Sequence, residues 1–263
     1  MNLTRRQLLA YTSATAALLQ LAPRFSFADD TPVLGGTLKM HIAIEPPILV
    51  NLTHTAGAAV YITGKVTEGL LTYDLDLNPQ PQLATAWTVS DDGLTYTFSL
   101  REGVKWHDGE AFSADDVVYS LHTLKNSNPR GRATFANVAD ITAINPHLVQ
   151  LTLNKPAPYL LSALAACESP IVAKHVYGDA NPQTHPNASA PIGTGPFVFK
   201  EWVRGSHVIL ERNPHYWDAP KPYLDRIIVR FIADSAATVA ALEAGEIDIS
   251  TGGVPLSDIE RIK

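Results

Sequence analysis

Residues 95–100 alternate between hydroxyl-bearing and large apolar side chains, a period of two that gives an extended strand one buried face. The side chains that would share this buried face are Tyr96, Phe98 and Leu100. Just before this run, Asp92-Gly93 supplies the residue types that a tight turn with positive φ requires. Residues 87–91 would then form the partner strand. The chain must therefore contain an antiparallel hairpin over residues 87–100, and an all-helical fold is excluded.

Other parts of the chain show similar local signals. A second hairpin is expected over residues 138–153, turning at Asn145-Pro146-His147, and a third over residues 197–211. Ser113 and the acids behind it form a capping-box-like start for a helix at 114–124. The other expected elements are strands at 38–44, 70–73, 225–232 and 247–249, helices at 58–68 and at 236–244 with Ser235 as its cap, and a loop at 126–134. Together they predict a mixed α/β (α+β) protein with several antiparallel pairs.

The first 28 residues have the order of an export signal. Arg5-Arg6 precede an apolar run at 8–22, which is too short and too polar to span a bilayer, where about 20 mostly apolar residues are needed. Pro23 and the small residues Ser26 and Ala28 follow, as at a signal cleavage site. The arginine pair favours the twin-arginine type, which exports folded cargo; a plain secretory signal is the alternative. We expect cleavage near Ala28 and a periplasmic mature protein.

Composition limits what this exported chain could bind. The sequence has 20 Lys and Arg against 26 Asp and Glu, and residues 1–28 contain three of the arginines and no acid. The mature protein is therefore more acidic still, which argues against nucleic acid or an anionic membrane as partner. No later run is long and apolar enough to span a membrane. Cys167 is the sole cysteine, so no internal disulfide can form, and a free, buried thiol is expected.

Seven sequence blocks occur in an order that resembles one protein family. They are TEGLLTY at 67–73, PQLATAW at 81–87, TYTFSLREGVKWHDG at 95–109, ADDVVYS at 114–120, GTGPF at 193–197, LERNPHYW at 210–217 and GEID at 245–248. Together they resemble the family 5 extracytoplasmic solute-binding proteins, the dipeptide-, oligopeptide- and nickel-binding components of ABC importers. The likeness covers residues 35–263, and a colinear series of blocks is far more specific than any single short motif.

The resemblance implies a fold and a domain organisation. Family members are two-lobed clamps of the periplasmic-binding-protein type II class, with an added β-rich subdomain on the first lobe. Carried onto this sequence, residues 33–67 and 190–263 would form the sheet core of the first lobe, and residues 68–189 the inserted subdomain. The chain stops about where the family passes into its second lobe, so we expect the amino-terminal half only, with the second lobe missing.

The resemblance also implies a function and a set of binding residues. The protein would bind peptides or peptide-like solutes and deliver them to the permease subunits of an ABC transporter, as a monomer without cofactor or catalytic activity. Three segments match ligand-facing parts of the family: Thr55, Ala56 and Gly57; Cys167, Glu168 and Ser169; and Thr251, Gly252 and Gly253. A glycine at such a place lets the backbone of a ligand approach closely.

Several alternatives stay open beside this interpretation. One is a truncated remnant that binds nothing, and another is a nickel, haem or other solute binder of the same family. An extracytoplasmic hydrolase is disfavoured, because His107-Asp108 and Ser113 lie in a block that turn and cap chemistry already explains. The nine histidines are scattered without the short spacing of a metal site, so no metal ligands are predicted.

Overall fold

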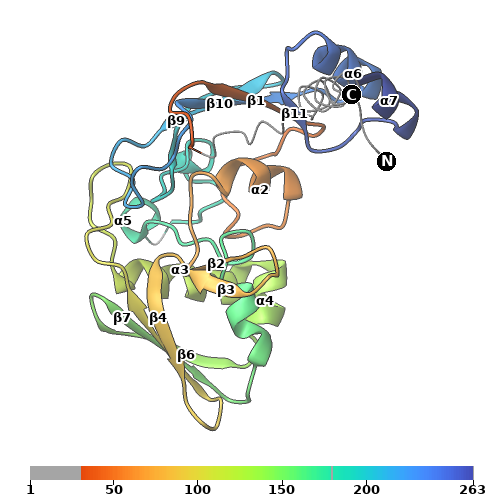
Figure 1. Ribbon diagram of the computed structural model, residues 1–263. Coiled ribbons are helices and arrows are strands. Elements are labelled where there is room, and N and C mark those ends of the chain that lie inside the picture. Colours follow the sequence, from red (N-terminus) through yellow and green to blue (C-terminus); the bar gives the residue numbers. More distant parts are fainter. Residues whose placement is uncertain (1–30, 179, 263) are drawn as a thin grey trace, which may run out of the picture. The chain divides into compact units, whose positions relative to one another are not determined.

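Five strands from both ends of the described chain form one sheet. The computed structural model describes residues 31–178 and 180–262, so the predicted export signal lies outside the described residues. In the order β11-β1-β10-β9-β8, β1 pairs in parallel with β10 and β11, and the other pairs are antiparallel (Figure 1). The strands are β1 (Thr37–Ile42), β8 (Phe197–Val203), β9 (His207–Arg212), β10 (Arg226–Phe231) and β11 (Ile249–Ser250). The hairpin predicted at 197–211 is confirmed, whereas β11 begins later than predicted.

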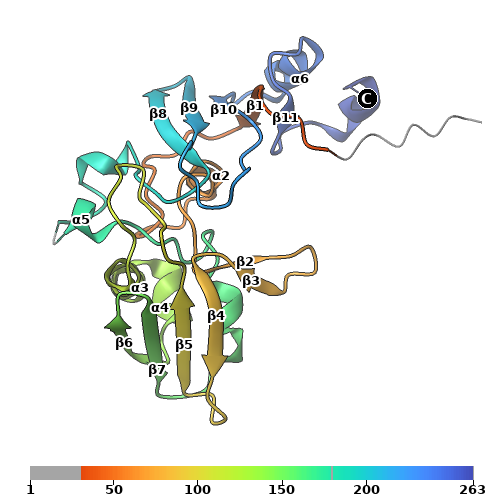
Figure 2. The ribbon, with the colours of Figure 1, turned by 60° about the vertical axis from the view of Figure 1, so that its left-hand side comes forward.

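A second sheet has four strands and is antiparallel throughout, in the order β4-β5-β7-β6 (Figure 2). The hairpins predicted at 87–100 and 138–153 are both present, and β5 pairs with β7 so that Phe98 lies opposite Val149. A separate ribbon is formed by β2 and β3. The strands are β2 (Leu71–Tyr73), β3 (Pro79–Pro81), β4 (Ala84–Val89), β5 (Thr95–Leu100), β6 (Val138–Asn145) and β7 (Leu148–Leu153).

Short helices connect and cover these sheets. They are α2 (Gly57–Thr63), α3 (Ala114–Ser127), α4 (Pro129–Thr134), α5 (Lys174–Tyr177), α6 (Ser235–Glu243), α7 (Ile259–Ile262) and the 3-10 turns η1 (Pro158–Ala163), η2 (Pro186–Ala188) and η3 (Leu256–Asp258). Within residues 31–178 and 180–262, no helix combines the length and the apolar character needed to cross a membrane.

The loop predicted at 126–134 is wrong, because this segment is helical. Helix α3 continues to Ser127, and α4 follows after a single residue, Asn128. The Asn128 carboxamide oxygen accepts hydrogen bonds from the backbone N–H groups of Arg130 and Gly131, both at 2.9 Å. Pro129 then occupies the first position of α4, where its missing N–H costs nothing. An N-cap followed by proline starts a new helix where the polar composition favoured a loop.

Two further helix boundaries differ from the predictions. Helix α2 ends at Thr63 instead of residue 68, with Gly64 as its C-cap. In α6 the cap is Asp234, whose carboxylate accepts from the Ala237 N–H at 2.7 Å, and Ser235 is the first helical residue. Carboxylate and hydroxyl side chains are both good N-caps, so the sequence alone could not decide between Asp234 and Ser235.

The capping box predicted at Ser113 is present and does more than start α3. The Asp116 carboxylate accepts from the Ser113 N–H at 2.9 Å, and its other oxygen accepts from the Lys174 N–H at 2.8 Å. Asp116 is only 4% exposed. One buried carboxylate therefore fixes both the start of α3 and the start of α5.

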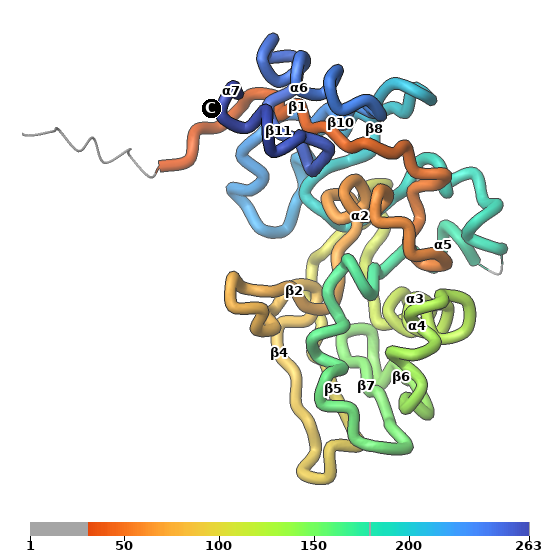
Figure 3. Tube along the Cα trace, turned by 90° about the vertical axis from the view of Figure 1, so that its right-hand side faces the viewer, coloured from red at the N-terminus to blue at the C-terminus, as the bar shows by residue number. Residues whose placement is uncertain are grey.

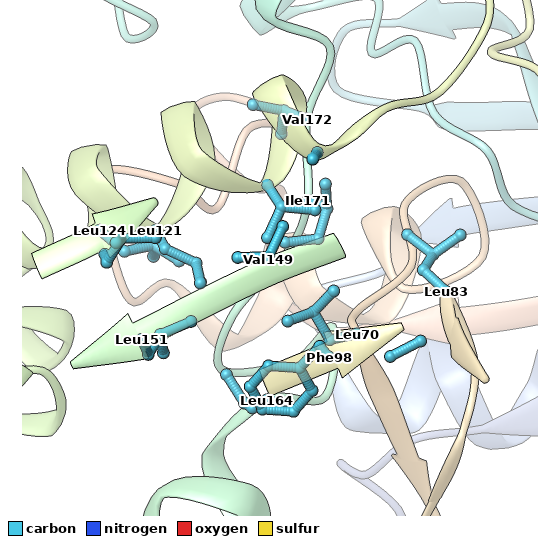
Figure 4. Packing of buried hydrophobic residues seen from close by; sticks show 14 of the residues in the cluster. Leu70, Leu83, Phe98, Leu121, Leu124, Val149, Leu151, Leu164, Ile171 and Val172 are labelled. Atoms are coloured by element: carbon cyan, nitrogen blue, oxygen red, sulfur yellow. The ribbon is translucent and has the colours of Figure 1, made fainter. Parts of the chain in front are cut away.

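Two hydrophobic clusters hold the elements together. The larger one fills the space between α3 and the four-stranded sheet, where Leu121 and Leu124 of α3 face Phe98, Val149 and Leu151 of the strands (Figure 4). In the smaller one, Ile62 of α2 packs against β1 and β10 of the five-stranded sheet. Each large apolar side chain that is fully buried contributes roughly 1.5–3 kcal/mol. Residues from Leu34 onward form one compact unit, and the division into a sheet core and an inserted subdomain stays a prediction.

The buried carboxylate of Glu68 connects segments that are distant in sequence. Glu68 is 1% exposed and accepts hydrogen bonds from four side chains. The donors are Gln82 Nε2 at 3.2 Å, Thr194 Oγ1 at 2.8 Å, Tyr216 Oη at 2.8 Å and Trp217 Nε1 at 2.9 Å. Burial raises the pKa of Glu68, and the four donors oppose this rise by favouring the charged form. The Glu68 carboxylate, which lies between α2 and β2, thus links this part of the chain to residues 82, 194 and 216–217.

A half-buried histidine, His107, makes a second connection in the same region. The Nδ1 atom of His107 accepts from the Gly193 N–H at 3.2 Å, and its Nε2 lies 3.0 Å from the Gly195 carbonyl oxygen, to which it donates. Burial lowers the pKa of His107, which favours the neutral ring that these two contacts require. His107 is therefore a structural residue, as the turn and cap interpretation of its sequence block implies.

Candidate functional site

A cavity of about 290 Å³ lies beside the start of α2. It is lined by Asn51, His54, Thr55, Gly57, Val60, Tyr61, Asn128, Arg130, Cys167 and Glu168. Three segments distant in sequence thus meet here, and four of the nine predicted binding residues are among them. Figures 1 and 3 show α2 between the five-stranded sheet and helices α3 and α4. Other hollows of about 510–530 Å³ occur in the described structure, but none of the nine predicted residues lines them.

Gly57, the first residue of α2, leaves this cavity open. A Cβ atom added to it would meet no other atom within 4 Å, and its φ is not in the left-handed region. Neither packing nor backbone conformation therefore requires glycine at this position. Glycine here instead leaves room beside the helix, which is what the close approach of a bound molecule needs.

Asn128 holds two walls of the cavity together. While its side-chain oxygen caps α4, its Nδ2 donates to the backbone oxygens of Asn51 at 3.1 Å and His54 at 3.2 Å. The side chain is 3% exposed. Sequence reasoning missed this residue, although the Asn-Pro pair at 128–129 is a recognisable helix start.

The two charged side chains in the lining neutralise each other. Arg130 donates a charge-assisted hydrogen bond to the Glu168 carboxylate. Partial desolvation within the cavity lining and the neighbouring Glu168 raise the pKa of Cys167, so its thiol stays protonated at neutral pH. Burial also lowers the pKa of His54, which favours its neutral ring. The cavity therefore presents polar but uncharged groups beside one internal ion pair.

Cys167 differs from the sequence-based expectation of a buried thiol, because it is exposed. It lies in the turn that follows Leu164 and Ala165, which are buried, and it points into the cavity lining instead of into the core. The neighbouring Glu168 takes part in the ion pair with Arg130. Of this predicted segment, Cys167 and Glu168 face the cavity.

The remaining predicted residues do not line the cavity. Ser169 is buried, and its hydroxyl donates to the Ala163 carbonyl oxygen at 2.6 Å, which gives it a structural role. Ala56 is the N-cap of α2. Thr251 bonds to the His41 carbonyl oxygen, through its N–H at 3.2 Å and its hydroxyl at 3.1 Å. Gly252 and Gly253 follow it, so the third predicted segment lies at the end of β11, apart from the cavity-lining set.

Comparison with known proteins places this geometry in context. A model described as bacterial extracellular solute-binding proteins, family 5 Middle, matches residues 78–263. The oligopeptide-binding protein AppA of Bacillus subtilis (strain 168) is 33% identical over 234 residues, which cover 86% of this chain and 42% of AppA. The structure of AppA from Bacillus subtilis with a nonapeptide matches with a TM-score of 0.80 and 30% identity, covering 88% of this chain and 46% of that one.

A nickel-related structure is also similar. NikZ from Campylobacter jejuni in complex with Ni(L-His) matches with a TM-score of 0.76 and 31% identity, over 86% of this chain and 44% of NikZ. The chain thus spans less than half the length of each of these proteins. Similar folds in this set carry different solutes, so the overall fold does not identify the solute.

Proposed function

Because the chain belongs to family 5 of the bacterial extracellular solute-binding proteins, we propose that it binds a peptide or peptide-like solute for an ABC importer. The solute would be captured outside the cytoplasm and delivered to the permease subunits. The protein would act as a periplasmic monomer, exported by the twin-arginine signal and cleaved near Ala28, and it would catalyse no reaction. Residues 33–67 and 190–263 would form the sheet core of its first lobe, with 68–189 as the inserted subdomain.

The observation that carries this proposal is the cavity beside α2. Thr55 and Gly57 line it from one segment, Cys167 and Glu168 from another, and these positions were predicted from family resemblance alone. Gly57 has no packing reason to be glycine, so its lack of a side chain serves the open space. The lining has no uncompensated charge, which suits the neutral main chain of a peptide better than a charged metal complex or a haem propionate.

Enlarging the side chain at position 57 tests the proposal. Gly57→Leu is expected to weaken the binding of short peptides by tenfold or more, about 1.4 kcal/mol, because the leucine would occupy the cavity. Isothermal titration with a pool of tripeptides to nonapeptides would measure the change. The melting temperature should not fall, since the new Cβ atom meets no other atom within 4 Å and the rest of the side chain has the open cavity to occupy.

Ala236→Leu provides the matched control, because Ala236 is an exposed first-turn residue of α6, outside the cavity. It also places a leucine in the first turn of a helix and should leave peptide affinity unchanged. If Gly57→Leu bound peptides as tightly as the parent protein, the cavity would not be the binding site. Native mass spectrometry that showed a nickel complex or haem bound, and no peptide, would favour the alternative solutes of the family.

A further inference from the structure

Buried polar atoms without a partner are concentrated next to the cavity. In the described part of the chain four such side-chain atoms occur, and three of them lie in residues 51–54: Asn51 Oδ1, Thr53 Oγ1 and His54 Nε2. The fourth is His147 Nδ1, in the turn between β6 and β7. Folded proteins rarely leave buried polar atoms unpaired, because each loses its hydrogen bonds to water without replacement. Three such atoms within four consecutive residues therefore need a specific explanation.

These atoms fall into two places. Asn51 and His54 line the cavity beside α2, whereas Thr53 lines a separate hollow next to α3. Asn51 is 7% exposed, so it lies at the bottom of the cavity, beneath the protein surface. Asn128 fixes the main chain at both ends of the stretch through the backbone oxygens of Asn51 and His54. The other polar atom of each side chain is already bonded, Asn51 Nδ2 to Thr63 Oγ1 and His54 Nδ1 to the Ala56 N–H, so neither side chain is free to turn to another partner.

The existing hydrogen bonds show which of the two atoms is an acceptor. Asn51 Nδ2 lies 2.5 Å from Thr63 Oγ1, and the Thr63 hydroxyl donates its only proton to the Ala59 carbonyl oxygen at 3.0 Å. Thr63 Oγ1 must therefore accept from the Asn51 amide nitrogen. The free atom of Asn51 is then its carbonyl oxygen, a hydrogen-bond acceptor.

The same reasoning makes His54 a donor. Its Nδ1 accepts from the Ala56 N–H at 3.0 Å, so this nitrogen carries no proton. A neutral imidazole has one proton, which must then be on Nε2. Burial lowers the pKa of His54 and so favours this neutral form. The cavity floor therefore offers one free acceptor and one free donor, separated by two residues in sequence.

We propose that Asn51 and His54 recognise the main-chain N–H and C=O groups of one residue of an extended peptide, which point to the same side of its chain. Asn51 Oδ1 accepts from the N–H of that residue, and His54 Nε2 donates to its carbonyl oxygen. This inference rests on the proposed function and adds the chemistry that is recognised at this cavity. A carboxylate or a haem propionate could satisfy the His54 donor, but neither has an N–H for Asn51. The two side chains therefore select a peptide main chain over an acid.

The rim of the cavity allows a solute to reach these atoms. Both lie just beneath the surface, so an amide reaches them when side chains at the rim shift. Tyr61 is 46% exposed, and the Arg130 side chain is 55% exposed. Exposed side chains of this kind change rotamer on a picosecond to nanosecond timescale. Movement of the rim thus needs no rearrangement of α2 or α4.

Two substitutions of His54 separate recognition from structure. In His54→Asn the side-chain oxygen can still accept from the Ala56 N–H, but no donor remains at the Nε2 position. In His54→Gln the amide nitrogen can take the place of Nε2, and the bond to Ala56 is lost. We expect trialanine to bind about tenfold more weakly to His54→Asn and within about threefold of the parent value to His54→Gln. The melting temperatures should have the opposite order, with His54→Gln the less stable variant.

Ester analogues of trialanine, each with one peptide N–H replaced by oxygen, test the Asn51 contact. One of them should bind the parent protein about tenfold more weakly than trialanine. The inference is wrong if trialanine binds His54→Asn more tightly than His54→Gln, because affinity would then follow stability. It is also wrong if every ester binds like trialanine. In both cases the proposed function stands. Absence of any trialanine binding to the parent protein would instead count against the proposed function itself.

Discussion

Gly193→Ala is expected to prevent stable folding, with a loss of at least about 4 kcal/mol in the free energy of unfolding. A Cβ atom at this position would lie 1.8 Å from the Val66 carbonyl oxygen and 2.5 Å from its carbonyl carbon. The clash is with backbone, which cannot turn aside as a flexible side chain could. The neighbouring residues fix that backbone, because the Gly195 N–H donates to the same Val66 oxygen at 2.9 Å and the Phe197 N–H to the Lys65 oxygen at 3.0 Å.

The contacts of His107 with Gly193 would be disturbed at the same time, since the Gly193 N–H and carbonyl oxygen both bond to that residue. Chemical denaturation followed by circular dichroism measures the loss. Gly57→Ala is the control, because its Cβ meets nothing within 4 Å, and it should be as stable as the parent protein. A Gly193→Ala variant that melts within a few degrees of the parent would show that residues 193–195 do not pack against 65–67 as described.

Glu68→Ala is expected to lower the free energy of unfolding by about 3–5 kcal/mol. The substitution would leave four donors, on Gln82, Thr194, Tyr216 and Trp217, without their common acceptor. Glu68→Gln keeps one side-chain oxygen and should cost less, about 1–3 kcal/mol.

The pH dependence of stability gives an independent check on Glu68. Because its pKa is raised in the folded protein above the ordinary value of 4.5, the folded state holds the proton more readily than the unfolded state. This contribution to stability is fully present below pH 4.5 and is lost as the pH rises through the folded pKa. Glutamine does not titrate, so the advantage of the parent protein over Glu68→Gln should narrow as the pH rises from 4.5. An advantage that widens over this range would mean that the four donors, and not burial, dominate the pKa.

The strand pairs could be predicted because their signals are local. The alternation at 95–100 and the Asp92-Gly93 turn lie within one short segment, and β4, β5 and the hairpin at 138–153 follow from such patterns. Helix α4 could not be predicted in this way. Asn128 is kept in place partly by its bonds to the backbone of Asn51 and His54, more than 70 residues away in sequence. Its polar surroundings therefore suggested a loop.

Glycines show the same limit at the level of single residues. Composition and periodicity do not distinguish Gly57 from Gly193, yet one leaves a cavity open and the other allows two backbones to touch. Cys167 was expected to be buried because isolated cysteines usually are, and only the turn at 164–169 brings it to the cavity. Each of these roles depends on residues that are distant in sequence but adjacent in the folded protein.

The candidate site was predicted in part, and through family resemblance instead of physical pattern. Thr55, Gly57, Cys167 and Glu168 do meet at one cavity. Asn51, His54, Asn128 and Arg130 were missed, because no spacing or motif indicates that residues from three parts of the chain will converge. Asn51 and His54 become distinctive only when their unpaired atoms are visible.

Chemical-shift mapping of the backbone amides during titration with trialanine tests the central claim most directly, because it detects weak binding and locates it. We expect the shifts to concentrate at residues 54–57, 130 and 167–168, around the cavity beside α2. Shifts that cluster instead around Tyr216, Trp217 and Tyr223, which line a different hollow, would contradict the assignment of this cavity as the solute site, as would the absence of any shift.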